Sequence, residues 1–242
     1  MQHHPQGALM ALPSALESVP ENHDERQRIA VDLSNSGVAC LELGDYNAAV
    51  QALSRSLKYC HVIMDEAEDT ETPIQTSLDA CLQASSSTKV QEPSSSRERY
   101  LYQQAARIPF SVGSNYRAAV LVSTLVTFNL ALAYQLTSMY KAAEPAQAQT
   151  LLMKAVKLYE LAFSMQQEEG FDNNTLFTLA TVNNLGLIHS QLNDRTAANQ
   201  CFQYLLSTLL YLTGSSNGSE LFDGFFRNAH AMIPKSESAP AA

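Results

Sequence analysis

Three asparagines recur in this chain inside a shared local pattern, and their side-chain amides are the groups best placed to do chemistry. In each copy a small residue follows two positions on, and a pair of alanines follows thirteen and fourteen positions on. The copies start at Asn35, Asn129 and Asn184, in NSGVACLELGDYNAA, NLALAYQLTSMYKAA and NLGLIHSQLNDRTAA. An amide carries both an acceptor and donors, so a row of amides can hold the backbone of an extended peptide whatever its sequence.

Residues suited to enzyme chemistry are poorly supplied by comparison. None of the six histidines has a partner at the spacing of a metal site or a catalytic triad. His189 falls where a core residue is expected, and the glycines at 214 and 218 follow a predicted helix rather than the strand that a phosphate loop requires. We therefore predict a protein that is not an enzyme, with no catalytic residues, no cofactor and no metal site.

Composition bounds the possible partners. The 242 residues are 45% hydrophobic, which is enough for a folded core, and only 16% charged. The formal net charge of −9 argues against nucleic acid or anionic lipid as the main partner. A protein or peptide ligand is expected instead, with no nucleic acid and no membrane.

Signals for cellular location are few. The four cysteines include no CxxC pair, which fits free thiols in a reducing compartment. No basic residue precedes Arg26, so the N-terminal stretch resembles neither a secretory signal nor a transit peptide. The longest apolar stretch, 118–134, is interrupted by polar residues and predicts a buried helix rather than a membrane span. We expect a cytoplasmic protein.

Helical periodicity predicts the elements that must position the three asparagines. The first hairpin runs from residue 25 to about 64, with Gly44-Asp45 as its turn. The second joins a helix over 115–136 to one over 148–168 through an extended connection, 138–147. The third joins 175–192 to 195–212 across Asn193-Asp194. Small residues that face each other one hairpin apart allow close packing, so the pattern predicts an all-α solenoid of three stacked hairpins.

The rest of the chain interrupts or flanks these hairpins. Residues 1–24 are predicted to be a disordered tail. The acidic and serine-rich residues 65–99 are predicted to be a long disordered insertion after the first hairpin, with room for a short helix around 76–83. Residues 100–112 begin with apolar–polar alternation and predict an extended segment that lies against the helices. Residues 214–242 are expected to form a C-terminal cap or tail.

At this point the chain resembles the tetratricopeptide repeat (TPR) family, over about 25–64 and 115–213. The repeat positions are filled by Leu33, Ser36-Gly37, Cys40, Ala49, Leu53 and Ser56; by Thr127, Leu130-Ala131, Tyr134, Ala155, Tyr159 and Ala162; and by Val182, Leu185-Gly186, His189, Ala198, Phe202 and Leu205. The long helices, NNLGLIHSQLND and Ala143-Glu144-Pro145 are closest in style to the repeats of kinesin light chains. The chain departs from the family pattern in having no tryptophan and no proline at the repeat ends.

The resemblance implies that the first helix of each hairpin lines a concave peptide-binding groove. Asn35, Asn129 and Asn184 would then hold peptide backbone, and the apolar residues beside them would select side chains: Val38, Phe128, Leu132 and Leu187. A second interpretation stays open, in which each asparagine bonds a neighbouring helix and orders the stack. Ser34, Val38 and Ala180 stand where carboxylate-binding members of the family carry cations, so a terminal carboxylate is not the expected ligand.

The function implied is that of a non-catalytic adaptor, which binds a peptide or helix of a partner protein in the groove. The alternative is an architectural subunit of a larger assembly, with the groove occupied by the chain's own tail or insertion. The sequence does not identify the partner or the oligomeric state.

Overall fold

The structure is a computed structural model that describes residues 22–66, 76–84, 99–171, 174–213 and 222–231. These residues form eight α-helices and one 3-10 turn, with no strand among them. The prediction of an all-α fold is confirmed for this part of the chain. Residues 1–21 of the predicted tail 1–24 lie outside the described residues. The last two residues of that tail are helical, since α1 begins at His23.

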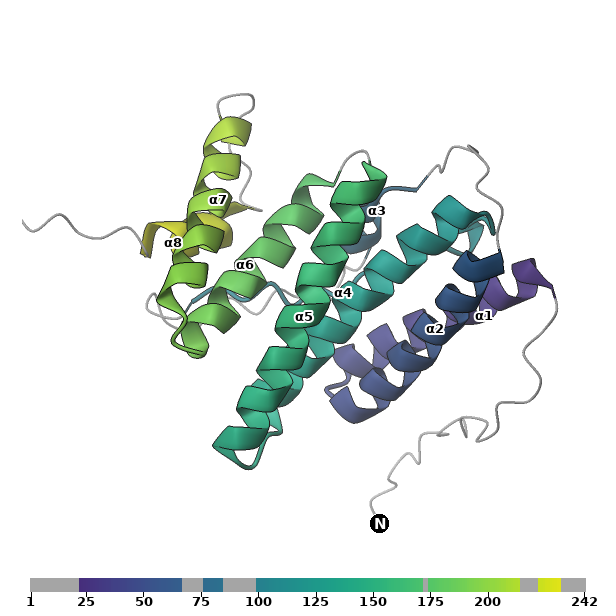
Figure 1. Ribbon diagram of the computed structural model, residues 1–242, viewed down its shortest axis with the longest axis horizontal. Helices are drawn as coiled ribbons and strands as arrows, with labels where there is room; N and C mark the ends of the chain where they lie inside the picture. Colours follow the sequence, from purple (N-terminus) through teal and green to yellow (C-terminus); the bar gives the residue numbers. More distant parts are fainter. Residues whose placement is uncertain (1–21, 67–75, 85–98, 172–173, 214–221, 232–242) are drawn as a thin grey trace, which may run out of the picture.

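Six of the helices pack as three consecutive pairs, each joined by a short turn (Figure 1). The pairs are α1 (His23–Glu42) with α2 (Tyr46–Glu66), α4 (Tyr116–Tyr140) with α5 (Pro145–Glu169), and α6 (Thr175–Gln191) with α7 (Arg195–Thr213). Contacts between α2 and α4 and between α5 and α6 place the pairs side by side in chain order. Gly44 and Asn193 end the turns of the first and third pairs in left-handed conformations, with φ of 73° and 62°.

Small residues set how closely the helices of a pair approach. A Cβ atom added to Gly37 would lie 2.6 Å from Cγ of Leu53 on α2, and one added to Gly186 would lie 2.9 Å from Cζ of Phe202 on α7. These are the glycines that follow the first and third recurring asparagines. The close contacts therefore explain the small residue in those two copies of the pattern.

The second pair differs from its prediction. Helix α4 continues to Tyr140 and α5 already begins at Pro145, so the extended connection predicted over 138–147 shrinks to four residues. Proline at the first helical position has no backbone N–H to leave unpaired, and it starts α5 rather than breaking it. The alanine pair at 142 and 143 consequently lies in the turn and not in a helix.

The insertion predicted over 65–99 is not wholly disordered. Residues 65 and 66 complete α2, and α3 (Leu78–Gln83) buries Leu78, Cys81 and Leu82 in the core. The short helix allowed for around 76–83 is thus a packed element that contacts α6. Residues 67–75 and 85–98 of the predicted insertion lie outside the described residues.

Helix α8 (Asp223–Ala231) completes the fold. It packs on α7 and α6 and buries Phe225. Helix α4 is the central element, and it is long and apolar enough by composition to cross a membrane. However, 94% of its most apolar window is buried inside the protein, as in a core helix.

Candidate peptide-binding groove

A segment of the chain itself lies along the row of asparagines. Residues 99–109, which we call the groove segment, contain neither helix nor strand and lead into the 3-10 turn Phe110–Val112. Four asparagine side chains each bond both backbone polar atoms of one residue in this segment. The pairs are Asn228 with Tyr100, Asn184 with Tyr102, Asn129 with Ala106, and Asn35 with Ile108.

The geometry of each pair is that of a two-point clasp. Oδ1 of Asn129 accepts from the Ala106 N–H at 2.7 Å, and its Nδ2 donates to the Ala106 carbonyl at 2.8 Å. The corresponding distances are 3.0 and 2.8 Å for Asn35, 3.1 and 2.9 Å for Asn184, and 2.9 and 2.6 Å for Asn228. Seven of the eight distances lie in the ordinary range of N–H···O hydrogen bonds, and the bond from Asn228 to the Tyr100 carbonyl is slightly shorter.

The bonded residues, 100, 102, 106 and 108, are all separated by even numbers. In an extended chain such residues point their backbone groups toward the same neighbour, so the register fits an extended segment. The order of the pairs also gives its direction. The segment enters beside α8, passes the third and second helix pairs, and leaves beside α1, opposite to the order of the pairs in the sequence.

The groove segment is part of the core rather than a surface loop. Tyr102, Ala105, Ala106 and Ile108 are each at most 4% exposed. The ring of Tyr102 lies edge-on to Phe128 at 6.5 Å and stacks on Phe225 at 5.9 Å between centroids. The bonds of Asn184 to Tyr102 and of Asn129 to Ala106 are fully buried, so at these two residues the asparagines supply bonds that no solvent molecule replaces.

The residues predicted to select ligand side chains lie in the same apolar core as the groove segment. Val38, Phe128 and Leu132 are fully buried and Leu187 is 5% exposed. Asn129 and Asn184 are also fully buried, whereas Asn35 is partly exposed. The structure therefore brings the three predicted asparagines onto one peptide segment, and that segment belongs to the chain itself.

A buried polar network extends the row at its α8 end. Asn184 Nδ2 also donates to the hydroxyl of Tyr159 at 3.0 Å, and its Oδ1 accepts from Asn183 at 3.1 Å. Asn183 in turn donates to the Tyr100 carbonyl at 3.1 Å and accepts from Asn228 at 2.6 Å. Burial raises the pKa of Tyr159 above its ordinary value, so its hydroxyl keeps the proton that it donates to Gln135.

Two members of this site, Asn183 and Asn228, were not predicted to hold peptide backbone. Asn183 directly precedes Asn184, and the doubled asparagine is a usable signal. Asn228 lies in α8, outside the repeats, and nothing in its surroundings marks it. The side chains of the groove segment do not indicate which of its residues are bonded, because the asparagines bond backbone N–H and carbonyl groups only.

A carboxylate anchors the path of the chain between α2 and the groove segment. The Asp79 carboxylate of α3 accepts from the N–H groups of Leu176 and Phe177, both at 2.9 Å, at the first turn of α6. It therefore satisfies backbone donors that a helix start leaves unpaired. Burial raises the pKa of this carboxyl above its ordinary value of 3.8, and the bonds from the backbone N–H groups oppose that rise.

Within the described residues no group of three histidine, cysteine or acidic side chains could hold a metal ion. Nδ1 of His189 lies 3.6 Å from Oδ2 of Asp194, at the turn between α6 and α7. His189 is not one of the residues that clasp the groove segment. No family model, no curated protein and no solved structure matches this chain. The candidate site accordingly rests on its own geometry: an amide row and the extended segment that it holds.

Proposed function

We propose that the chain is a non-catalytic protein-interaction subunit of architectural type. Its fold is a TPR-like solenoid of three helical hairpins, the groove is closed by the chain's own segment, and partner proteins bind to the other surfaces. The observation that carries the proposal is the set of four asparagine clasps on residues 100, 102, 106 and 108. A groove already filled in this way is not open to a partner peptide.

Displacement of the groove segment would be costly. A competing peptide would have to replace eight hydrogen bonds and the buried contacts of Tyr102 and Ile108. The resident segment is also covalently tethered, which gives it an effective concentration on the order of millimolar or more. Both effects favour the resident groove segment over a competing partner peptide.

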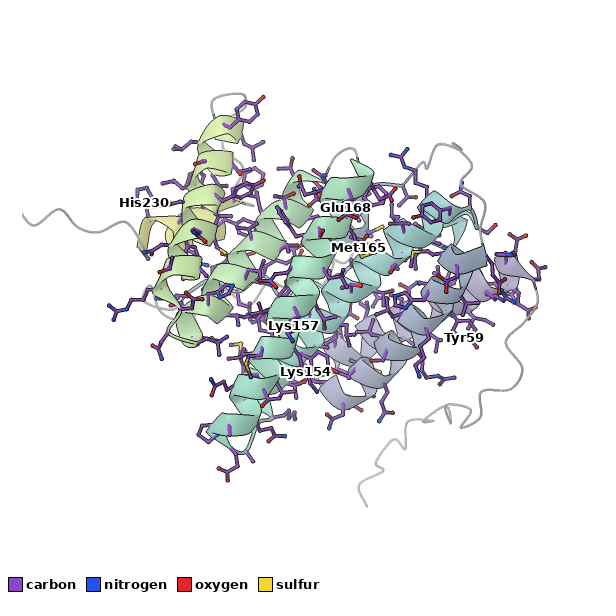
Figure 2. The ribbon with its side chains drawn as sticks, viewed as in Figure 1. Tyr59, Lys154, Lys157, Met165, Glu168 and His230 are labelled. Carbon is purple, nitrogen blue, oxygen red and sulfur yellow. The ribbon has the colours of Figure 1, made fainter. Side chains whose placement is uncertain are left out.

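Other surfaces have the composition of interaction sites. Large apolar side chains at least 43% exposed lie on α4, α5 and α7: Met139, Tyr140, Met153, Leu161 and Tyr204. Helix α5 also carries the charged side chains Lys154, Lys157 and Glu168, which Figure 2 labels. Aromatic and apolar anchors among charged side chains are what protein–protein interfaces use.

The test is affinity purification of the tagged full chain with its partners, followed by competition. One competitor is a synthetic peptide of residues 99–109; its matched control has the same sequence with N-methyl groups on the backbone nitrogens of Tyr100, Tyr102, Ala106 and Ile108. The N-methyl peptide keeps every side chain but cannot donate to the asparagines. Partners that stay bound in excess of either peptide support the proposal, and partners released by the unmodified peptide alone contradict it.

The second candidate function is an adaptor whose groove segment gives way to a partner peptide. It is favoured by one observation: the asparagines bond backbone atoms only, so any extended peptide with suitable small and apolar side chains offers the same groups. Release of partners by the unmodified peptide, with none released by its N-methylated control, is the result expected of this candidate.

A further inference from the structure

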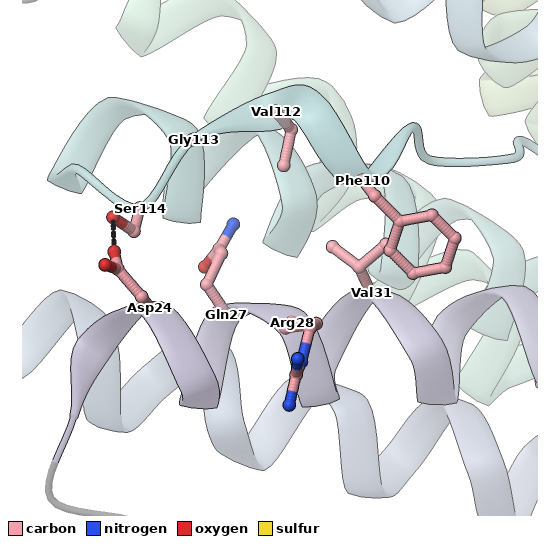
Figure 3. Close-up of a pocket in the computed structure, with 8 residues that line it drawn as sticks. All are labelled: Asp24, Gln27, Arg28, Val31, Phe110, Val112, Gly113 and Ser114. Carbon is pink, nitrogen blue, oxygen red and sulfur yellow. Dashed lines mark hydrogen bonds between the residues drawn. The ribbon is translucent and has the colours of Figure 1, made fainter.

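A cavity of about 320 Å³ opens beside the point where the groove segment leaves the row of asparagines. It lies between the first turns of α1 and the stretch 110–114 that leads into α4 (Figure 3). Its lining is Asp24, Gln27, Arg28, Val31, Phe110, Val112, Gly113 and Ser114. The volume is at the lower end of the range for ligand sites in proteins, enough for a short piece of an extended chain.

The side chain of Gln27 is the group in this cavity that lacks a partner. Gln27 is 3% exposed, and within the described part of the chain neither its Nε2 nor its Oε1 has a hydrogen-bond partner. Figure 3 shows the side chain directed from α1 toward Val112, into the space between the two walls. A buried amide with both groups unpaired is costly, and a ligand that pairs them would remove that cost.

Gln27 continues the row of asparagines. Residues 27, 31 and 35 of α1 are four positions apart, so Gln27 lies two turns before Asn35 on the same face of the helix. The groove segment does not reach it: after Ile108 the chain meets Pro109, which has no N–H, and then turns through Phe110–Val112. Gln27 therefore extends the row of side-chain amides beyond the last residue of the groove segment that bonds to the row.

The charges around the cavity favour a neutral ligand. The Asp24 carboxylate already accepts a hydrogen bond from the Ser114 hydroxyl. The Arg28 side chain is exposed and points away from the 110–114 wall (Figure 3). The remaining walls are the apolar side chains of Val31, Val112 and Phe110, of which Phe110 is 66% exposed.

We propose that Gln27 binds one residue of a neutral, extended segment of a partner protein, which prolongs the line of the groove segment past Ile108. The Gln27 amide donates to the backbone carbonyl of that residue and accepts from its backbone N–H, as Asn35, Asn129 and Asn184 do for the resident chain. The inference deepens the proposed function by naming the ligand class of one surface outside the closed groove, and to that extent it rests on the proposed function.

The test is an NMR titration of the ¹⁵N-labelled full chain, which follows the Gln27 side-chain NH2 signals and, in every variant, the backbone amide signals of the residues that line the cavity. The probe is N-acetylvaline N-methylamide, whose valine offers a neutral backbone N–H and carbonyl. Two related compounds serve as controls: N-acetyl-N-methylvaline N-methylamide lacks the valine N–H, and N-acetylvaline as its anion replaces the neutral amide by a carboxylate. The variants are Gln27→Leu, which keeps the size without the amide, and Gln51→Leu, the same change at an exposed position of α2.

The expected result is a saturable shift of the Gln27 signals with the amide probe, and binding at least about tenfold weaker for the N-methylated compound, for the anion and for Gln27→Leu. Gln51→Leu should bind like the unchanged protein. Gln27→Leu should also melt no lower than the unchanged protein, because it breaks no hydrogen bond that the structure contains. Equal binding by Gln27→Leu, equal binding of the anion, or Gln27 signals that do not respond would each overturn the inference.

The two proposals fail in different ways. If the probe does not bind but partners stay bound against the groove peptide, only the Gln27 site is lost. If the groove peptide releases the partners while the probe still binds at Gln27, only the closed-groove function is lost.

Discussion

The ring of Tyr100 lies directly on the backbone of Gly224 in α8. A Cβ atom at position 224 would be 2.4 to 2.6 Å from three ring carbons of Tyr100, which is closer than packed atoms approach. We predict that Gly224→Ala displaces the ring and loosens this end of the groove segment. Burial raises the pKa of Tyr100 to about 12, and in the variant that pKa should fall toward its ordinary value of 10. NMR titration of ring-labelled tyrosine measures the change.

Arg227→Ala is the matched control for that variant. It raises helix propensity in the same helix at an exposed position and leaves the Tyr100 ring in place. An unchanged Tyr100 pKa in Gly224→Ala would mean that the ring and α8 are not held together in solution.

The loss of folding stability on replacing a clasping asparagine should be larger where its hydrogen bonds are more deeply buried. Asn129→Ala leaves the N–H and carbonyl of the buried Ala106 unpaired, which should lower the free energy of unfolding by on the order of 3 kcal/mol. Asn35 is partly exposed, so water can replace its bonds to Ile108, and Asn35→Ala should cost about 1 kcal/mol. Urea denaturation of both variants measures the difference. Equal costs would argue that the clasps are not the source of the stability.

Asp79 should make stability depend on pH in a specific direction. Burial raises the folded-state pKa of this carboxyl above the ordinary 3.8, so the folded protein favours the protonated form more than the unfolded chain does. The contribution of Asp79 to stability is therefore full below that ordinary value and is lost as pH rises through the folded-state pKa. Asp79→Asn, which keeps an acceptor for the first turn of α6, should lack this loss in thermal melts recorded between pH 3 and pH 8.

A second substitution separates charge from capping at the same position. Asp79→Ala removes the acceptors of Leu176 and Phe177 and should cost about 1 kcal/mol at low pH, as the loss of a helix cap does, and less as the pH rises through the folded-state pKa of Asp79. If Asp79→Asn and the unchanged protein show the same pH profile, the carboxyl does not titrate abnormally.

Cys81 can report whether the groove segment opens. Its carbonyl accepts from the Arg107 N–H at 3.0 Å, and burial raises the pKa of its thiol to about 12, so little reactive thiolate exists near neutral pH. Asn129→Ala should raise the rate of Cys81 alkylation by iodoacetamide by about tenfold or more, since opening exposes the thiol. Mass spectrometry measures the rate. Cys40, partly exposed on α1, is the internal control and should react at an unchanged rate.

The sequence pattern was sufficient to predict the helices and the importance of the recurring asparagines, because both follow from local spacing. It was insufficient for the partner of those asparagines. Their bonds go to backbone atoms of residues 100–108, and backbone atoms are the same at every position of a chain. Alternation at Tyr100 and Tyr102 indicated an extended segment, but its register against the row depends on the path of a long connection.

Two further differences have local physical causes. The extended connection predicted over 138–147 contains Pro145, which instead starts α5, because proline at the first helical position is tolerated although it breaks a helix in the interior. Helix α3 is short and its neighbours in sequence are acidic and serine-rich, so composition masked the buried Leu78, Cys81 and Leu82. Nothing in the sequence marks Gln27 as a binding residue, because its lack of a hydrogen-bond partner depends on where the groove segment ends.

The direction of the groove segment has a consequence for how the molecule unfolds. Arrays of helical hairpins normally touch only their immediate neighbours, so they can fray from either end. Here a single stretch of chain is bonded to α8, α6, α4 and α1 in succession. Loss of either terminal unit removes partners from the same tie that secures the middle, so the array should melt in one cooperative step rather than peel apart repeat by repeat.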